Sequence, residues 1–262
     1  MYHDVVDRHA ADSSGLPGHG PNRYKINLLV FERHVAAIAA TGRSPGTVAD
    51  LMAGREALRE EPRLYLTFDD GGSSALPVGE RLAAAGWVGH FFVPVDFIGR
   101  PGFLDRAGVA ALAAMGHVIG THSCSHPVPM TRLSEQRLHE EWRRSVAVLS
   151  EIIEDQVFAG SVPGGYWSNR VVHAAATEGV DVLFTSDPVA SIREREGCLL
   201  LGRYAILDGT SPDTAARLAR GDLVPRVRQL ATWRAKTVPK ALLGNRYRQV
   251  RIALLQLLSN KR

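Results

Sequence analysis

The sequence predicts an α/β fold whose parallel strands, each followed by a helix, curl into a barrel. Strand-like and helix-like segments alternate along most of the chain, which is typical of βα units and a parallel sheet. The number of such units within 262 residues favours a barrel over a small open sheet. A chain that is 45% hydrophobic and 22% charged can bury one large core, which excludes a disordered or disulfide-dense protein.

Local signals justify each element in turn. Runs such as RLYLTF and VGHFFVPV are rich in β-branched and aromatic residues. Strands are expected over 63–68, 88–95, 117–123, 156–162, 180–186 and 198–207. Helices are expected over 75–86, 108–116, 134–155, 168–177, 222–235 and 245–259. The helix over 134–155 is the clearest, because Ser134 is a suitable N-cap and an apolar stripe follows it. That stripe consists of Leu138, Trp142, Val146, Leu149 and Ile153.

Charge is unevenly distributed along the chain. Residues 223–262 contain ten Lys or Arg and no Asp or Glu, which leaves 21 basic against 27 acidic residues in 1–222, a net charge of −6. We therefore expect a barrel domain over 1–222 and a basic helical tail over 223–262, packed on or next to the barrel. A basic amphipathic helix can also lie on an anionic membrane. Nucleic-acid binding is disfavoured, because the acidic body would oppose it.

The first residues, MYHDVVDRHA, lack the apolar stretch of a secretory signal. No run of about 18 apolar residues is present that could span a bilayer. The two cysteines, Cys124 and Cys198, do not make a disulfide framework. We expect a cytoplasmic protein of bacterial type, with the tail as a contact to the inner membrane surface.

Two adjacent carboxylates, Asp69 and Asp70, follow the first predicted strand and precede Gly71 and Gly72. A regular strand would point them to opposite faces, whereas a turn begun by the glycines brings both towards one cavity. Their mutual repulsion would then favour a division of labour, with one carboxylate on a cation and the other free to accept a proton. Taken alone, Asp-Asp-Gly is weak evidence, and an ordinary turn is the better explanation of it.

Two histidines, His122 and His126, lie in the segment THSCSHP after a predicted strand. Two neutral imidazoles and a nearby aspartate can hold a divalent ion and leave positions open for water and substrate. The alternative for an isolated pair is two hydrogen-bonded loop histidines. Cys124 is a further candidate ligand, although a cysteine in this place is more often a small buried residue.

A third group, Ser161-Val162-Pro163-Gly164-Gly165-Tyr166, also follows a predicted strand. Adjacent glycines let the backbone approach a ligand closely and expose N–H groups that can hold an oxyanion. A plain turn explains Pro-Gly-Gly equally well when it is taken alone.

Together and in this order, TFDDG, HSCSHP and VPGG resemble the motifs of the polysaccharide deacetylases, the NodB-homology proteins of carbohydrate esterase family 4. The resemblance covers residues 60–190, and Met1-Tyr2-His3-Asp4-Val5 is similar to a segment that often begins such domains. It implies a distorted (β/α)7 barrel of the TIM-like type. It also implies a hydrolase that uses one divalent metal ion, with zinc expected, to remove N-acetyl groups.

The resemblance carries over residue by residue. It implies that Asp70, His122 and His126 are the metal ligands and that Asp69 is the general base for the attacking water. The backbone N–H of Gly164 would stabilise the tetrahedral oxyanion. A bound metal lowers the pKa of its water and polarises the amide carbonyl, which makes this division of roles chemically coherent.

The sequence departs from the family at two positions. Ser161 stands where the third motif usually has an arginine that pairs with the catalytic aspartate. Arg203 could replace that charge from another strand, or it could form a salt bridge at a strand end. The histidine that acts as general acid is also missing, because the last histidine of the chain is His173. Loss of that acid would cost about 10²–10⁴ in rate.

His3 is the first candidate for the missing acid, because its segment is expected to form an early strand near the barrel mouth. A structural hydrogen bond is the alternative role for His3, and His19 in a glycine-rich loop is a weaker candidate. His173 is expected on a surface helix. Tyr166 and Asp187 are candidates for lining the substrate site, and capping a turn is the commoner role of an aspartate such as Asp187.

The sequence therefore predicts a metal-dependent deacetylase of an N-acylated sugar or oligosaccharide in polysaccharide or glycoconjugate biosynthesis. Two alternatives stay open. The protein could be a glycan-binding relative that kept the metal and lost the acid. It could also be a deformylase or deacetylase of a lipid-linked sugar at the inner membrane surface.

Overall fold

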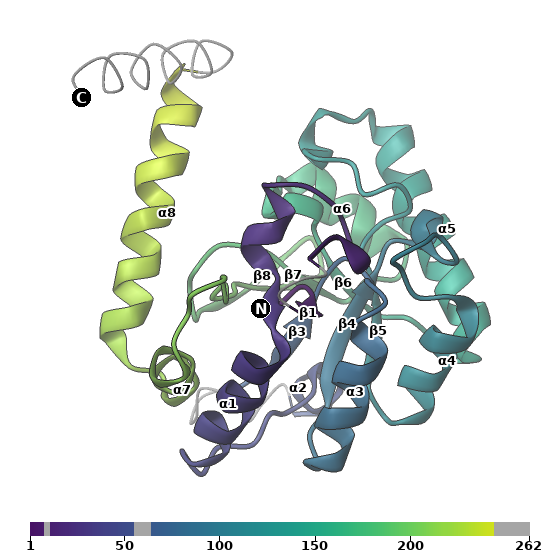
Figure 1. Ribbon diagram of the computed structural model, residues 1–262. Helices are drawn as coiled ribbons and strands as arrows, with labels where there is room; N and C mark the ends of the chain where they lie inside the picture. The colour runs from purple at the N-terminus through teal and green to yellow at the C-terminus, as the bar shows by residue number, and fades with distance from the viewer. Residues whose placement is uncertain (8–10, 55–63, 244–262) are drawn as a thin grey trace.

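A curled sheet of seven strands forms the centre of the computed structural model, which describes residues 1–7, 11–54 and 64–243 (Figure 1). The sheet is a half-barrel with helices on its outer side, so the α/β barrel-type fold is confirmed. Its strand order is β3-β4-β5-β6-β7-β9-β8. All neighbouring strands are parallel except β8 and β9, which are antiparallel.

Every predicted strand has a counterpart within its expected range, although each is shorter. The strands of the sheet are β3 (Leu66–Phe68), β4 (Gly89–Val93), β5 (Val118–Thr121), β6 (Ala159–Ser161), β7 (Val182–Phe184), β8 (Ile192–Arg195) and β9 (Cys198–Leu201). β8 was not among the predicted strands. All four of its residues are exposed, so it lacks the alternation of a half-buried strand.

Helices follow most of the strands and cover the outer face of the sheet (Figure 1). They are α1 (Leu28–Ala39), α2 (Val48–Ala53), α3 (Ala75–Ala84), α4 (Arg106–Ala114), α5 (Glu135–Ile153), α6 (Asn169–Thr177), α7 (Pro212–Arg220) and α8 (Leu223–Leu243). The hydroxyl of Ser134 accepts a hydrogen bond from the backbone N–H of Arg137, which confirms Ser134 as the N-cap of α5. α1, α2 and α7 were not among the predicted helices.

α8 is longer than the helix expected over 222–235 and stands beside the rest of the molecule (Figure 1). The helix expected over 245–259 lies outside the described residues. No helix in the described part of the chain combines the length and the apolar character needed to cross a membrane.

The N-terminal segment runs beside the first strand of the sheet. Tyr2 forms an isolated parallel bridge with Phe68, and the short strand β1 (Val5–Val6) pairs in parallel with β2 (Ile26–Asn27). The ring of Tyr2 stacks on Phe68 at 5.3 Å, and Phe68 stacks on Phe91 at 4.9 Å. This aromatic packing places His3 and Asp4 next to the end of β3.

The strands approach one another closely near the site. A Cβ added to Gly120 on β5 would lie 2.4 Å from the ring of Phe92 and 2.7 Å from the carbonyl oxygen of Ala159. Only glycine fits between β4 and β6 at this point. The close packing fixes the end of β5, from which the histidine loop departs.

Candidate active site

The candidate catalytic residues lie at one edge of the sheet, where the parallel strands end. Asp69 and Asp70 follow β3, His122 follows β5, and Arg203 follows β9. Because the carboxyl ends of parallel strands meet at the same edge, segments separated by up to 134 residues come together there.

Asp70, His122 and His126 form a group whose potential ligand atoms all lie within 4.8 Å of one another. The same oxygen of Asp70, Oδ1, is 3.4 Å from Nε2 of His122 and 3.3 Å from Nε2 of His126. Asp70 and His122 are buried, and the side chain of His126 is 13% exposed. The structure thus brings the three predicted ligands together.

The donor set fits a divalent metal ion. Donors bound at about 2.0–2.1 Å in tetrahedral geometry lie about 3.3 Å apart, which matches both Asp70–histidine distances. Nδ1 of His122 lies 2.8 Å from the carbonyl oxygen of Ser161, an acceptor. That bond requires the proton on Nδ1, so Nε2 is the nitrogen that can offer a lone pair to a metal, once it releases the proton that it shares with Asp70 in the metal-free protein. Burial opposes charge on Asp70, but the bonds from His122 and His126 hold its pKa well below the usual range.

The backbone around these ligands is strained. Among the described residues, five non-glycine residues have positive φ, and three of them lie here: Asp70 (74°), Ser123 (63°) and His126 (56°). Each such residue costs about 1–3 kcal/mol and persists only where its surroundings enforce it. The concentration of strain indicates a functional site that the fold holds in place.

Asp69 is paired with Arg203 rather than with the histidines. NH1 of Arg203 donates to Oδ1 of Asp69 at 2.7 Å, and NH2 donates to Oδ2 at 2.8 Å. Burial opposes the ionised carboxylate, but the charges of Arg203 and His122 outweigh it and lower the pKa of Asp69 to about 2. Asp69 is therefore an ionised hydrogen-bond acceptor beside the proposed metal site at neutral pH.

Arg203 is held from several strands at once. Besides Asp69, its guanidinium donates to the carbonyl oxygen of Thr185, to Oγ1 of Thr67 and to Oγ of Ser161. Arg203 therefore forms a salt bridge at a strand end, and its partner is Asp69, the proposed catalytic aspartate. The hydroxyl of Ser161 also lies 3.3 Å from Oδ2 of Asp69.

The glycine turn lies next to this edge of the sheet. Gly164 and Gly165 have φ of 64° and 73° within the 3₁₀ turn Pro163–Gly165. A Cβ on Gly165 would lie 2.3 Å from the side chain of Ser186, so glycine is required there. Tyr166 is 41% exposed, and the carboxylate of Asp187 accepts a 3.0 Å bond from the indole of Trp167.

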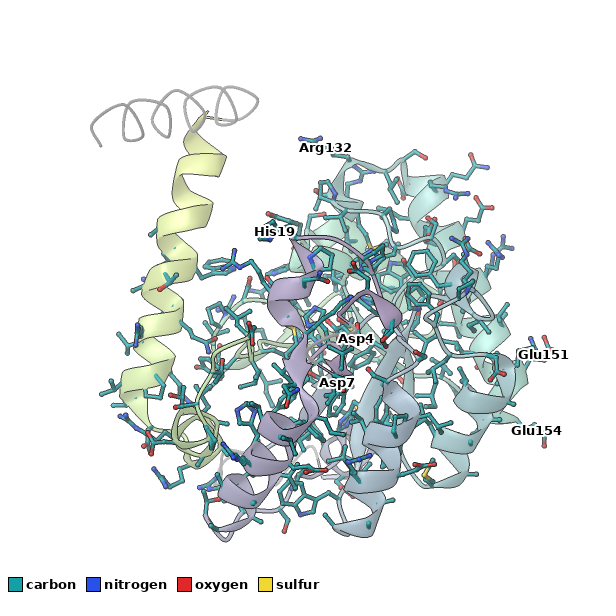
Figure 2. The ribbon with its side chains drawn as sticks, viewed as in Figure 1. Asp4, Asp7, His19, Arg132, Glu151 and Glu154 are labelled. Atoms are coloured by element: carbon teal, nitrogen blue, oxygen red, sulfur yellow. The ribbon has the colours of Figure 1, made fainter. Side chains whose placement is uncertain are left out.

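His3 lies beside the two carboxylates. Burial lowers its pKa, and the charges of Asp70 and Asp69 act against that shift. Its ring packs on Tyr24 at 4.5 Å, and its buried Nδ1 has no hydrogen-bond partner among the described residues. His19 is exposed in its loop (Figure 2), and His173 is exposed on α6.

Two buried carboxylates near the site were not singled out in the sequence. Oδ1 of Asp4 (labelled in Figure 2) accepts bonds from the hydroxyls of Ser14 at 2.6 Å and Ser74 at 2.9 Å, and burial raises its pKa. Glu141 on α5 contacts the loop between the two histidines. Asp4 belongs to the N-terminal segment Met1-Tyr2-His3-Asp4-Val5, whose resemblance to the family concerns the segment as a whole. Nothing in the local sequence distinguishes Glu141 from a solvent-facing helix residue.

Two sequence comparisons found similarity to polysaccharide deacetylases. Residues 57–183 match the family model described as polysaccharide deacetylase. The chain is 25% identical over 217 residues to YxkH of Bacillus subtilis (strain 168), which carries a provisional assignment as a polysaccharide deacetylase; the match spans 80% of this chain and 71% of that protein.

Solved structures share the fold. A polysaccharide deacetylase from Bacillus cereus superposes with a TM-score of 0.70 at 18% identity, covering 84% of this chain and 67% of its own. IcaB from Ammonifex degensii superposes with a TM-score of 0.65 at 24% identity, covering 79% of this chain and 94% of its own.

Proposed function

Because residues 57–183 belong to the polysaccharide deacetylase family, we propose that this protein is a metal-dependent hydrolase that removes the N-acetyl group from an N-acylated sugar or glycan. The observation that carries the proposal is the arrangement of Asp70, His122 and His126 beside an ionised Asp69. Two nitrogen donors and one carboxylate leave coordination positions open, as in catalytic zinc sites. Zinc is the expected ion, and polysaccharide or glycoconjugate biosynthesis is the expected setting.

Each residue has a distinct part in the proposed reaction. Asp70, His122 and His126 would hold the ion, which would supply Lewis-acid polarisation of the acyl carbonyl and a lowered pKa for its water. Asp69, kept ionised by Arg203, accepts the proton of the attacking water. The backbone N–H of Gly164 stabilises the tetrahedral oxyanion, and Tyr166 and Asp187 line the substrate site.

His3 is our candidate for the acid that protonates the leaving amine. Its position beside Asp69 and Asp70 and its unpartnered Nδ1 support this role. Amines leave poorly unless they are protonated, whereas aryl esters need less help. We expect His3→Asn to lower kcat/KM for an N-acetylated oligosaccharide by about 100-fold and to affect a chromogenic acetyl ester much less. An equal loss on both substrates would argue against His3 as the acid.

Acetate release from N-acetylated oligosaccharides tests the proposed activity directly. We expect turnover by the wild type with zinc, and loss of both turnover and bound zinc in His122→Ala and His126→Ala. Zinc binding without turnover of amides or esters would favour the alternative of a glycan-binding relative. The absence of a histidine beyond His173 is the observation that keeps this alternative open.

We also propose that residues 1–222 form the catalytic domain and that 223–262 attach it to the inner, anionic surface of the bacterial membrane, where a lipid-linked sugar would be an accessible substrate. Leu223, Val224 and Val227 on α8 are 75%, 66% and 59% exposed. The exposed Arg228 lies beside them, and residues 223–262 contain no acid. Exposed apolar side chains with cations and without acids suit an anionic bilayer.

Co-sedimentation with vesicles tests this location. We expect binding to vesicles that contain phosphatidylglycerol, little binding to pure phosphatidylcholine, and loss of binding in the double variant Leu223→Ser/Val227→Ser. Leu29→Ser is the matched control, because Leu29 is 63% exposed on α1 in the acidic body. Failure of the wild type to bind either vesicle would refute the location without affecting the proposed activity.

A further inference from the structure

The loop between the two histidines is anchored by a buried carboxylate from another element. Glu141 lies on α5 and is 1% exposed. Its Oε2 accepts the backbone N–H groups of Cys124 at 2.9 Å and Ser125 at 2.8 Å. Its Oε1 accepts the hydroxyl of Ser125 at 2.7 Å and lies 3.1 Å from NH2 of Arg137. A buried carboxylate is costly unless it is paired and hydrogen-bonded, and Glu141 is both.

The remaining loop residues are fixed by other contacts. The backbone N–H of Ser123 donates to Oγ1 of Thr121 at 3.0 Å, and that of His126 donates to Oγ of Ser123 at 3.2 Å. Ser123 and His126 have positive φ, which the chain adopts only where its surroundings enforce it. The carbonyl oxygens of Ser123 and Cys124 accept the backbone N–H groups of Val95 and Asp96. Glu141 is the acceptor for the backbone N–H groups of Cys124 and Ser125, the two residues in the middle of the loop.

We propose that Glu141 is a positioning residue that sets the metal affinity of the site by fixing the loop on which His122 and His126 lie. The inference rests on the proposed metal binding by Asp70, His122 and His126. Without Glu141, the backbone N–H groups of the buried Cys124 and the exposed Ser125 lose their acceptor, and the loop can relax from its strained backbone. The distance between the two imidazoles would then vary more widely, and fewer molecules would have the distance that suits the ion. Residues that orient metal ligands typically contribute about 10–100-fold to affinity.

The test measures zinc affinity by chelator competition on the metal-stripped full chain. We expect Glu141→Ala to weaken zinc binding by about 10–100-fold. Glu141→Gln should weaken it less, because one amide oxygen can still accept from the loop. Glu140→Gln is the matched control: Glu140 is the neighbour on α5, its side chain is 46% exposed, and it also pairs with Arg137, at 2.8 Å. We expect its affinity to stay near that of the wild type.

A second measurement separates positioning from general stability. Denaturant unfolding of each variant, with and without zinc, gives the stability of the metal-free protein and the increment that zinc adds. If Glu141 only stabilises the fold, its replacement will lower the stability of the metal-free protein and leave the zinc increment unchanged. We expect the zinc increment to shrink. Glu141→Gln retains the shape of the side chain and carries the test if Glu141→Ala does not fold.

The outcomes distinguish this inference from the function on which it rests. Wild-type zinc affinity in folded Glu141 variants, with an unchanged absorption spectrum of the cobalt-substituted protein, would overturn the positioning role alone. A wild-type protein that takes up no zinc would overturn both. Weakened affinity in the Glu141 variants with normal affinity in Glu140→Gln would support the proposal.

Discussion

The ion pair between Asp69 and Arg203 determines the charge next to the proposed metal site. The guanidinium meets the carboxylate with two nitrogens, at 2.7 and 2.8 Å, and both side chains are buried. Such a bidentate pair orients the carboxylate as well as keeping it ionised. The acceptor oxygen available to an attacking water therefore depends on a residue from the opposite part of the sheet.

Replacement of Arg203 should impair catalysis in a pH-dependent way. Arg203→Lys keeps the charge but loses the bidentate contact with Asp69, so we expect kcat/KM to fall by about 10-fold. We expect Arg203→Ala to lower kcat/KM by about 100-fold. Because Asp69 is active when ionised and loss of Arg203 raises its pKa, the acid limb of the pH–rate profile should move to higher pH in Arg203→Ala. Arg106→Ala removes an exposed ion pair with Glu151 and should change neither the rate nor the profile. An unshifted acid limb in Arg203→Ala would contradict the role of the pair.

At this scale the sequence predicted the residues in local motifs and offered Arg203 as one possible partner of Asp69, but it gave no sign of Glu141. Asp69, Asp70, His122 and His126 lie in short segments after strands, so their meeting at one edge follows from the parallel sheet. The contact between Arg203 and Asp69 joins residues 134 positions apart, and it depends on the order of β7, β9 and β8. Glu141 follows another glutamate in a charged helical segment, and only the packing of α5 against the sheet shows that it is buried.

Helix ends provide the clearest stability test at the scale of an element. The C-cap of α5 is Glu154, whose φ of 54° is left-handed. Glu151 and Glu154 both point away from the body at the end of α5 (Figure 2). We expect Glu154→Gly to raise the free energy of unfolding by about 0.5–1 kcal/mol, because glycine adopts this conformation without steric cost.

Glu151→Gly is the comparison for that substitution, because Glu151 lies within the helix. We expect it to lower the free energy of unfolding by about 1 kcal/mol. Thermal and denaturant unfolding of the two variants measure both effects. Destabilisation by Glu154→Gly would show that the left-handed conformation does not limit stability at this helix end.

The elements that the sequence predicted are those with strong local patterns. The buried runs that became β3 to β7 and β9, and the apolar stripe of α5, are visible without tertiary information. β8 pairs on the edge of the sheet with all four residues exposed, so its pairing with β9 rather than its composition makes it a strand. α1 also carries apolar residues at helical spacing, but its N-cap, Asn27, immediately follows the short pairing between β1 and β2, which depends on residues far apart in the chain.

At the scale of the whole molecule, buried histidines link stability to pH. Burial lowers the pKa of His34 and His117, and it lowers that of His90 to about 4. Histidine titrates near pH 6.5 in an unfolded chain. Between pH 6.5 and about 4 the unfolded chain therefore binds more protons at these histidines than the folded one does. Their contribution to the free energy of unfolding is fully present above pH 6.5 and is lost as the pH falls through this range.

Denaturant unfolding of the metal-stripped protein at pH 7 and pH 5 tests this dependence without a contribution from metal release. We expect a lower unfolding midpoint at pH 5. His90→Gln should show a smaller difference between the two pH values than the wild type, because His90 no longer titrates. Equal midpoints of the wild type at both pH values would contradict the assignment of neutral buried histidines.

The central claim is that the carboxylate and histidines at the edge of the sheet support metal-dependent removal of an N-acetyl group. Its most direct test is acetate release from an N-acetylated oligosaccharide by the metal-stripped full chain, before and after addition of one equivalent of zinc. We expect activity only with zinc, and none in Asp69→Asn, which leaves the three proposed ligands in place. Equal acetate release with and without zinc, or undiminished release by Asp69→Asn, would contradict the account.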